Sequence, residues 1–60
     1  MIDDRLWSAE DLSGFLGIPL KTIYNWRHKR TGPQAIKVGR HLRYRRADVE
    51  QWLDELALAY

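Results

Sequence analysis

The chain has 60 residues and a formal net charge of +2, so it has room for one domain with one small core. It lacks cysteine, which excludes disulfides and thiolate metal sites, and three Trp, three Tyr and one Phe must supply the large apolar side chains. Residues 1–5 do not form a signal-peptide pattern, and no apolar run approaches the roughly 20 residues of a membrane span. We therefore expect residues 1–60 to form one cytoplasmic domain without a membrane segment.

The first predicted helix begins after Ser8. Ser8 is a favourable N-cap, and Asp11 stands three residues later as a shorter form of the capping-box Glu. Trp7 and Leu12 have the spacing of a hydrophobic staple, and Gly17 is suited to the left-handed C-cap. The expected apolar stripe of this helix is Leu12, Phe15 and Leu16.

The second predicted helix covers residues 20–29. Pro19 fits the first turn of a helix, where its missing N–H costs nothing. Ile23 and Trp26 share the face expected to be buried, and the breakers at 31–33 end the segment.

Residues 35–38 and 41–45 alternate with period two and predict a β-hairpin. Pairing Val38 with Leu42 and Ile36 with Tyr44 would place all four apolar side chains on one face, with a three-residue loop at 39–41. Gly39 at the first loop position instead favours a two-residue type II′ turn. We follow the apolar pattern and expect the three-residue loop.

The last predicted helix runs from Arg46 to about Ala59, with Asp48 and Glu50 in its first turn. Its apolar stripe is Val49, Trp52, Leu53 and Leu56. The predicted fold is thus mostly α with a small β-hairpin, in the order helix, turn, helix, hairpin, helix.

Charge is unevenly distributed along the chain. All eight acids lie at the two ends, whereas residues 12–47 contain no acid and nine of the ten Lys and Arg. This pattern predicts a strongly positive face of the kind that binds a polyanion. The alternatives are a solvated basic surface without a partner, and an adaptor that binds an acidic protein.

The exposed face of the second helix has side chains suited to the major groove, where they can reach base edges or phosphates. The following hairpin would project its cations toward a phosphate backbone or minor groove. The predicted DNA-binding residues are Lys21, Thr22, Tyr24, Asn25, Arg27, His28, Lys29, Arg30, Lys37, Arg40, His41 and Arg43.

Several motifs occur in a characteristic order over almost the whole chain: LWSAEDL at 6–12, LGIP at 16–19, TIYNW at 22–26, IKVGR at 36–40, LRYRRADV at 42–49 and WL at 52–53. In this the chain resembles the excisionase-type, MerR-like DNA-binding family. The resemblance implies a winged helix-turn-helix in which helix 20–29 enters the major groove of double-stranded DNA. It implies that the wing at 37–43 contacts the neighbouring minor groove or the backbone.

Members of that family serve as phage or mobile-element excisionases, which are recombination directionality factors, or as small transcriptional regulators. The resemblance therefore implies a protein that binds and bends DNA to direct site-specific recombination, with transcriptional regulation as the alternative. An integrase partner and cooperative self-association on DNA are implied in the same way. Pro19 departs from the family pattern, because a capping Ser or Thr is usual there.

Other functions fit the residues less well. Trp7, Trp26 and Trp52 are candidate stacking platforms for single strands, but each lies on an apolar stripe and is expected in the core, as is Tyr44. Tyr24 stands at the boundary between packing and groove contact. His28 and His41 lack the further ligands of a metal site, and no spacing suggests a nucleophile–base pair, so we expect neither cofactor nor catalysis. Arg45 and Arg46 can contact DNA or pair with Asp48 or Glu50.

Overall fold

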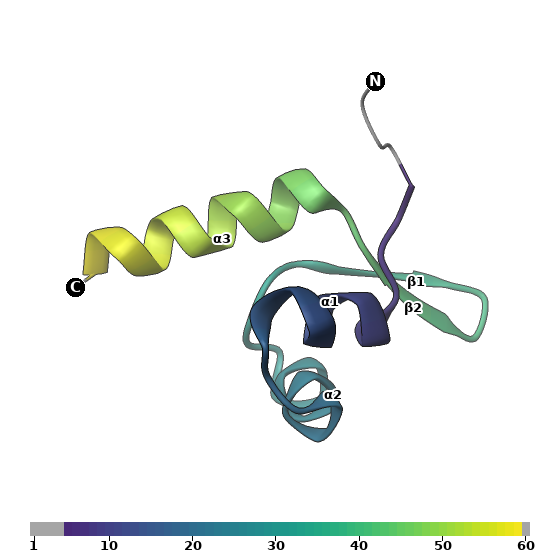
Figure 1. Cartoon of the computed structure of the whole chain (residues 1–60). Coiled ribbons are helices and arrows are strands. Elements are labelled where there is room, and N and C mark those ends of the chain that lie inside the picture. The colour runs from purple at the N-terminus through teal and green to yellow at the C-terminus, as the bar shows by residue number, and fades with distance from the viewer. Residues whose placement is uncertain (1–4, 60) are drawn as a thin grey trace.

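The computed structural model describes residues 5–59 and contains three helices and one hairpin (Figure 1). Asp3 and Asp4, two of the acids at the N-terminal end, lie outside the described residues, as does most of the segment tested for a signal peptide. The predicted order is confirmed, and the fold is a winged helix-turn-helix. Its elements are α1 (Ala9–Leu16), α2 (Leu20–Lys29), β1 (Ala35–Val38), β2 (His41–Tyr44) and α3 (Arg46–Ala59).

Helix α1 is bounded by the two caps that the sequence predicts. The Asp11 amide donates to the Ser8 hydroxyl and the Ser8 amide donates to the Asp11 carboxylate, each at 3.0 Å. These two bonds satisfy amides that have no partner within the helix. Gly17 closes the helix in the left-handed conformation with φ of 69°.

Helix α2 begins and ends without the usual capping residues. Pro19 is its N-cap and makes no side-chain cap hydrogen bond. At the other end Arg30 adopts the left-handed conformation with φ of 57°, which normally favours glycine. Gly32, also at positive φ, lies so close to the Trp26 ring that a Cβ there would come within 2.9 Å of Trp26 Cε3.

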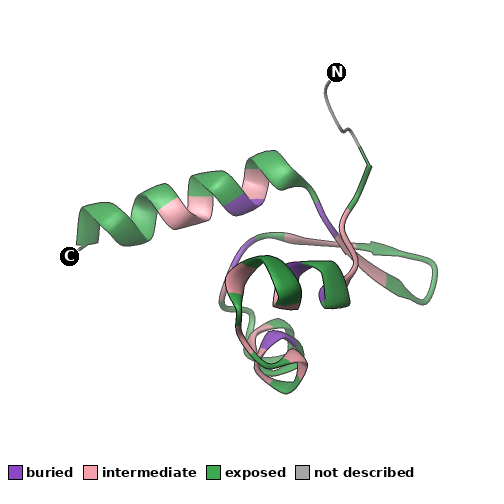
Figure 2. Cartoon of the chain, in the orientation of Figure 1, coloured by how far each residue is buried: buried purple, intermediate pink, exposed green. Residues whose placement is uncertain are grey.

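Four elements meet in the core. Figure 2 shows the buried positions on the inner sides of the three helices and at the base of the hairpin. Trp7 exchanges two backbone hydrogen bonds with Tyr44, each of 2.8 Å, so the segment before α1 runs along β2. The buried apolar residues are Ala9, Leu12, Ile23, Tyr44 and Val49.

The predicted stripe of α1 was wrong at Phe15, which is 54% exposed. Its ring lies 4.8 Å from the Trp7 ring, centroid to centroid. Trp7 packs against the core, whereas Phe15 does not and contacts the Trp7 ring from an exposed position.

The predicted hairpin register was also wrong. Val38 pairs with His41, and Ala35 with Tyr44, which leaves a two-residue loop at Gly39 and Arg40. Gly39 has φ of 63° while Arg40 does not have a positive φ, as a type II′ turn requires. Ala35 and Tyr44 therefore face the core, whereas Val38 lies on the other face of the hairpin and is 49% exposed. The register thus follows the turn preference of Gly39 and not the alternation of apolar residues.

Helix α3 packs through its N-terminal part, as far as Leu53. Val49 is buried, Leu53 packs against the core, and Trp52 contacts Trp26. Leu56, expected in the stripe, is 39% exposed, because the second half of the helix extends away from the other elements (Figure 1). Among residues 5–59 the helices are all too short or too polar to cross a membrane.

Candidate nucleic-acid interface

One face of α2 is free of contacts with the core. Lys21, Asn25 and His28 follow each other at i, i+4 and i+7 and are exposed, while Ile23 on the opposite side is fully buried. Thr22 lies at the edge of this face and is half-buried. The helix thus presents amide, ammonium and imidazole groups in a row that fits a major groove.

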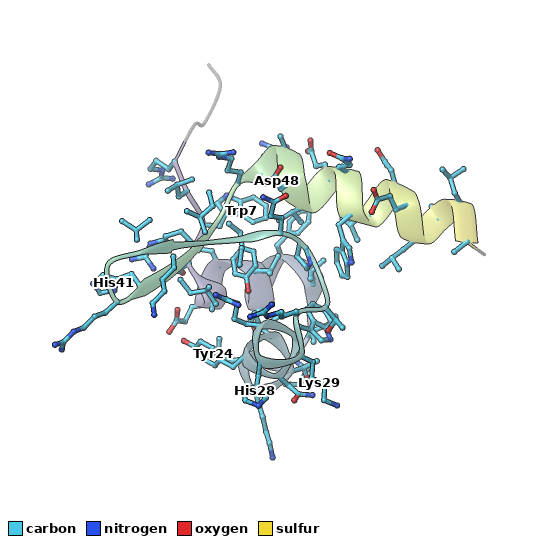
Figure 3. All side chains as sticks on the ribbon, turned by 180° about the vertical axis from the view of Figure 1, so that it is seen from behind. Trp7, Tyr24, His28, Lys29, His41 and Asp48 are labelled. Carbon is cyan, nitrogen blue, oxygen red and sulfur yellow. The ribbon has the colours of Figure 1, made fainter. Side chains whose placement is uncertain are left out.

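Tyr24 lies between this face of α2 and the wing. Its ring is half exposed and lies on the wing side of α2, whereas Lys29 lies on the far side (Figure 3). Arg27 follows three residues later and lies close enough to the Tyr44 phenol to act on it electrostatically. Burial raises the pKa of Tyr44, and the Arg27 charge opposes that increase. The sequence allowed either packing or groove contact for Tyr24, and its exposure makes the side chain available for contact.

A groove of about 280 Å³ lies between α2, the wing and the first turn of α1, and we call it the α2–wing groove. The sequence did not indicate that α1 lies beside the wing, because the extended segment before Ser8 is too short to be read as a strand. The pairing of Trp7 with Tyr44 brings the two together. The groove is lined by Ser8, Ala9, Glu10, Tyr24, Arg40, His41, Leu42 and Arg43.

The register of the wing distributes its cations over two faces. Lys37 pairs with Leu42 and shares its face, whereas Arg43 pairs with Ile36 on the opposite one. The expected three-residue loop would have placed Lys37 and Arg43 on the same face. The Arg43 guanidinium also donates a hydrogen bond of 2.8 Å to the Leu42 carbonyl and is half-buried. Arg40 occupies the exposed turn.

The last turn of α2 carries Arg27, His28 and Lys29. Cations there interact favourably with the partial negative charge of the helix C-terminus, so they stabilise α2 as well as adding to the positive surface. Arg30 extends this cluster past the end of the helix and is exposed.

Among the described residues, the cations of α2 and the wing form no ion pair with a carboxylate. In the part of the chain that the structure describes, no cation from Lys21 to Arg45 lies within ion-pair distance of a carboxylate. Arg46 is different, because it pairs with Glu50 at 3.1 Å. The sequence allowed Arg46 either to pair with an acid of this helix or to contact DNA. Arg45 is exposed and makes no such pair with the described residues.

The structure places the predicted residues in two groups, one on and just after α2 and one on the wing, where Lys37 and Arg43 lie on opposite faces. Within residues 5–59, no three His, Cys, Asp or Glu side chains lie together so as to hold a metal ion. Exposed predicted residues are Lys21, Tyr24, Asn25, Arg27, His28, Lys29, Arg30, Lys37, Arg40 and His41; Thr22 and Arg43 are half-buried.

The sequence matches the model of a known protein family. A family model described as a helix-turn-helix domain matches residues 8–57, from the N-cap of α1 into α3. Comparisons with curated proteins and with solved structures give no significant match. The matched segment covers most of the chain and contains α2 and the wing. The chain belongs to the helix-turn-helix domain family, a family of DNA-binding domains.

Proposed function

We propose that the protein binds specific sites in double-stranded DNA as a single domain, with α2 in the major groove and the wing against the neighbouring minor groove or backbone. The observation that carries the proposal is the exposed row Lys21, Asn25 and His28, flanked by wing cations that have no carboxylate partner in the described chain. Because cations on two adjacent elements form no ion pair among residues 5–59, a polyanion that spans both elements is the ligand that fits.

Within this proposal the two elements have different roles. The Asn25 amide is suited to a bidentate contact with an adenine edge, and Lys21 to guanine. Arg40 and Lys37 project from a short hairpin and are suited to phosphates, which present the same charge at every sequence. Thus α2 supplies most of the specificity and the wing supplies affinity.

We further propose an excisionase-like role, in which the protein bends DNA and has no catalytic step of its own. A winged module buries only roughly 600–1,000 Å² on DNA and reads a few base pairs, so adjacent protomers are the means of gaining specificity. The acids of α3 on one protomer and the basic wing of the next have complementary charges. A site-specific integrase is the further partner that this role implies.

A small transcriptional regulator is the second candidate, because the same face of α2 and the same wing would serve it. The two functions differ in what happens at adjacent sites. A directionality factor gains from neighbours and bends the duplex, whereas a single-site regulator does not need either property.

The experiment is a titration of duplexes that carry one, two or three copies of a selected site, with circular-permutation gels to measure bending. The excisionase-like role predicts tighter binding per site on the tandem duplexes together with bent DNA. Equal, independent affinities on straight DNA would favour the regulator, and no preference for any selected site would contradict sequence-specific binding.

A further inference from the structure

In the proposed complex, one strand of the DNA would pass through the α2–wing groove. This inference rests on the proposed function. Adjacent major and minor grooves of a duplex are separated by one sugar–phosphate strand. If α2 enters one groove and the wing reaches the next, that strand has to run between them. Arg40, His41 and Arg43 line this space and are suited to phosphates.

One acidic side chain lines the same space. Glu10, in the first turn of α1, is exposed and makes no hydrogen bond or ion pair within the described chain. Its neighbour Asp11 is different, because the Ser8 amide donates to the Asp11 carboxylate at 3.0 Å and lowers its pKa. Glu10 therefore lines the proposed path of the strand, and its carboxylate has no ion-pair partner in the described chain.

We propose that Glu10 limits the affinity of the interface by repelling the phosphates that pass through the α2–wing groove. Because phosphates carry the same charge at every sequence, this repulsion lowers specific and non-specific binding by the same factor. Glu10 also interacts favourably with the positive N-terminal end of α1, so one carboxylate both stabilises the helix and weakens the phosphate contact. Because the overall affinity is then moderate, stable binding requires the correct base contacts and adjacent protomers on the DNA.

The test compares two variants that remove one negative charge each. Glu10→Gln acts inside the groove, whereas Glu55→Gln acts on the exposed part of α3 and is not one of the groove-lining residues. Both have the same net charge, so any general electrostatic effect is shared. Fluorescence anisotropy at low salt measures Kd on a selected duplex and on a random duplex, each short enough to hold one protomer, so that the α3 acids meet no neighbouring wing. Far-UV circular dichroism checks that both variants are folded.

For Glu10→Gln we expect binding to tighten about three- to tenfold on both duplexes, and for Glu55→Gln by less than about twofold, because Coulomb repulsion falls with distance. Added salt should reduce the difference between the variants. Equal effects of the two variants, or a gain on the selected duplex alone, would overturn the inference while leaving DNA binding intact. If the unmodified protein binds no duplex, the proposed function fails together with the inference.

Discussion

The indole rings of Trp26 on α2 and Trp52 on α3 lie 5.2 Å apart, centroid to centroid, with their planes tilted by 58°. This contact joins the helix proposed to read DNA to the helix that extends from the fold. Both rings are half-buried, and Trp26 also packs against the buried core. Aromatic pairs of this kind add to the stability that their burial provides.

Replacing Trp52 by Ala should therefore lower the free energy of unfolding by about 2–4 kcal/mol, somewhat less than for a fully buried aromatic residue. Urea unfolding followed by circular dichroism measures this change. Leu58→Ala is the control, because Leu58 is 88% exposed on the same helix. Its effect should stay within about 0.5 kcal/mol. Equal losses for the two variants would show that the Trp52 contact is not what holds α3.

Replacing Gly32 and Gly14 by alanine should change the stability of the protein in opposite directions. At Gly32 a Cβ would meet Trp26 Cε3 at 2.9 Å, and the φ of 79° is also unfavourable for alanine, so Gly32→Ala should destabilise the protein. At Gly14, inside α1, a Cβ meets no other group within 4 Å. Gly14→Ala should stabilise the protein by about 0.5–1 kcal/mol. Thermal unfolding of both variants checks the two signs, and a stable Gly32→Ala variant would contradict the close approach to Trp26.

The capping box gives a pH dependence with a definite sign. The Ser8 amide holds the pKa of Asp11 below its ordinary value, mainly through the backbone hydrogen bond. A carboxylate whose pKa is lower in the folded state stabilises the protein above the unfolded pKa of about 3.9, and this contribution disappears as pH falls through the lower, folded value. The stability difference between the unmodified protein and Asp11→Asn should therefore be largest near neutral pH and shrink below about pH 4.

Thermal unfolding from neutral to acid pH measures that difference. Asp54→Asn removes the same charge from the exposed surface of α3 and serves as the control. A difference for Asp11→Asn that stays constant down to the lowest pH, or that is matched by Asp54→Asn, would contradict the capping role of the ionised carboxylate.

Local signals were sufficient to predict the boundaries of the three helices. Ser8 and Gly17 bound α1 as expected, since capping depends on residues a few positions apart. The same holds for the start of α3 at Arg46. At the end of α2, however, the left-handed C-cap is Arg30 and not a glycine, while Gly32 has a positive φ of its own and lies against Trp26.

The long-range contacts could not be predicted from these signals. In the hairpin, the apolar alternation predicted a three-residue loop, whereas Gly39 favoured a two-residue turn. The observed register has the two-residue turn. Phe15 contacts the ring of Trp7, and Trp7 pairs with Tyr44 far along the chain. The same pairing places Glu10 beside the wing. The predicted DNA-binding residues lie on α2 and the wing, and their contacts with DNA stay predictions.

Substitutions on α2 should change both the affinity and the sequence specificity of DNA binding, whereas a substitution on the wing should change the affinity alone. Asn25→Ala and Lys21→Ala should each cost roughly 1–3 kcal/mol on the selected site and relax its specificity, because a base contact is lost. Arg40→Ala should weaken binding to all sequences about equally, because a phosphate contact is lost. Anisotropy titrations on selected and mismatched duplexes separate the two patterns. If Asn25→Ala leaves affinity and specificity unchanged, the row of Lys21, Asn25 and His28 does not read the bases.

The salt dependence of duplex binding tests the central claim most directly. The cations proposed to contact phosphates have no carboxylate partner within residues 5–59, and about four to six such contacts would release a corresponding number of counterions. Titrations at a series of salt concentrations should then give a plot of log K against log[salt] with a slope on the order of −4 to −5. A slope near zero would contradict the claim that α2 and the wing form a nucleic-acid interface.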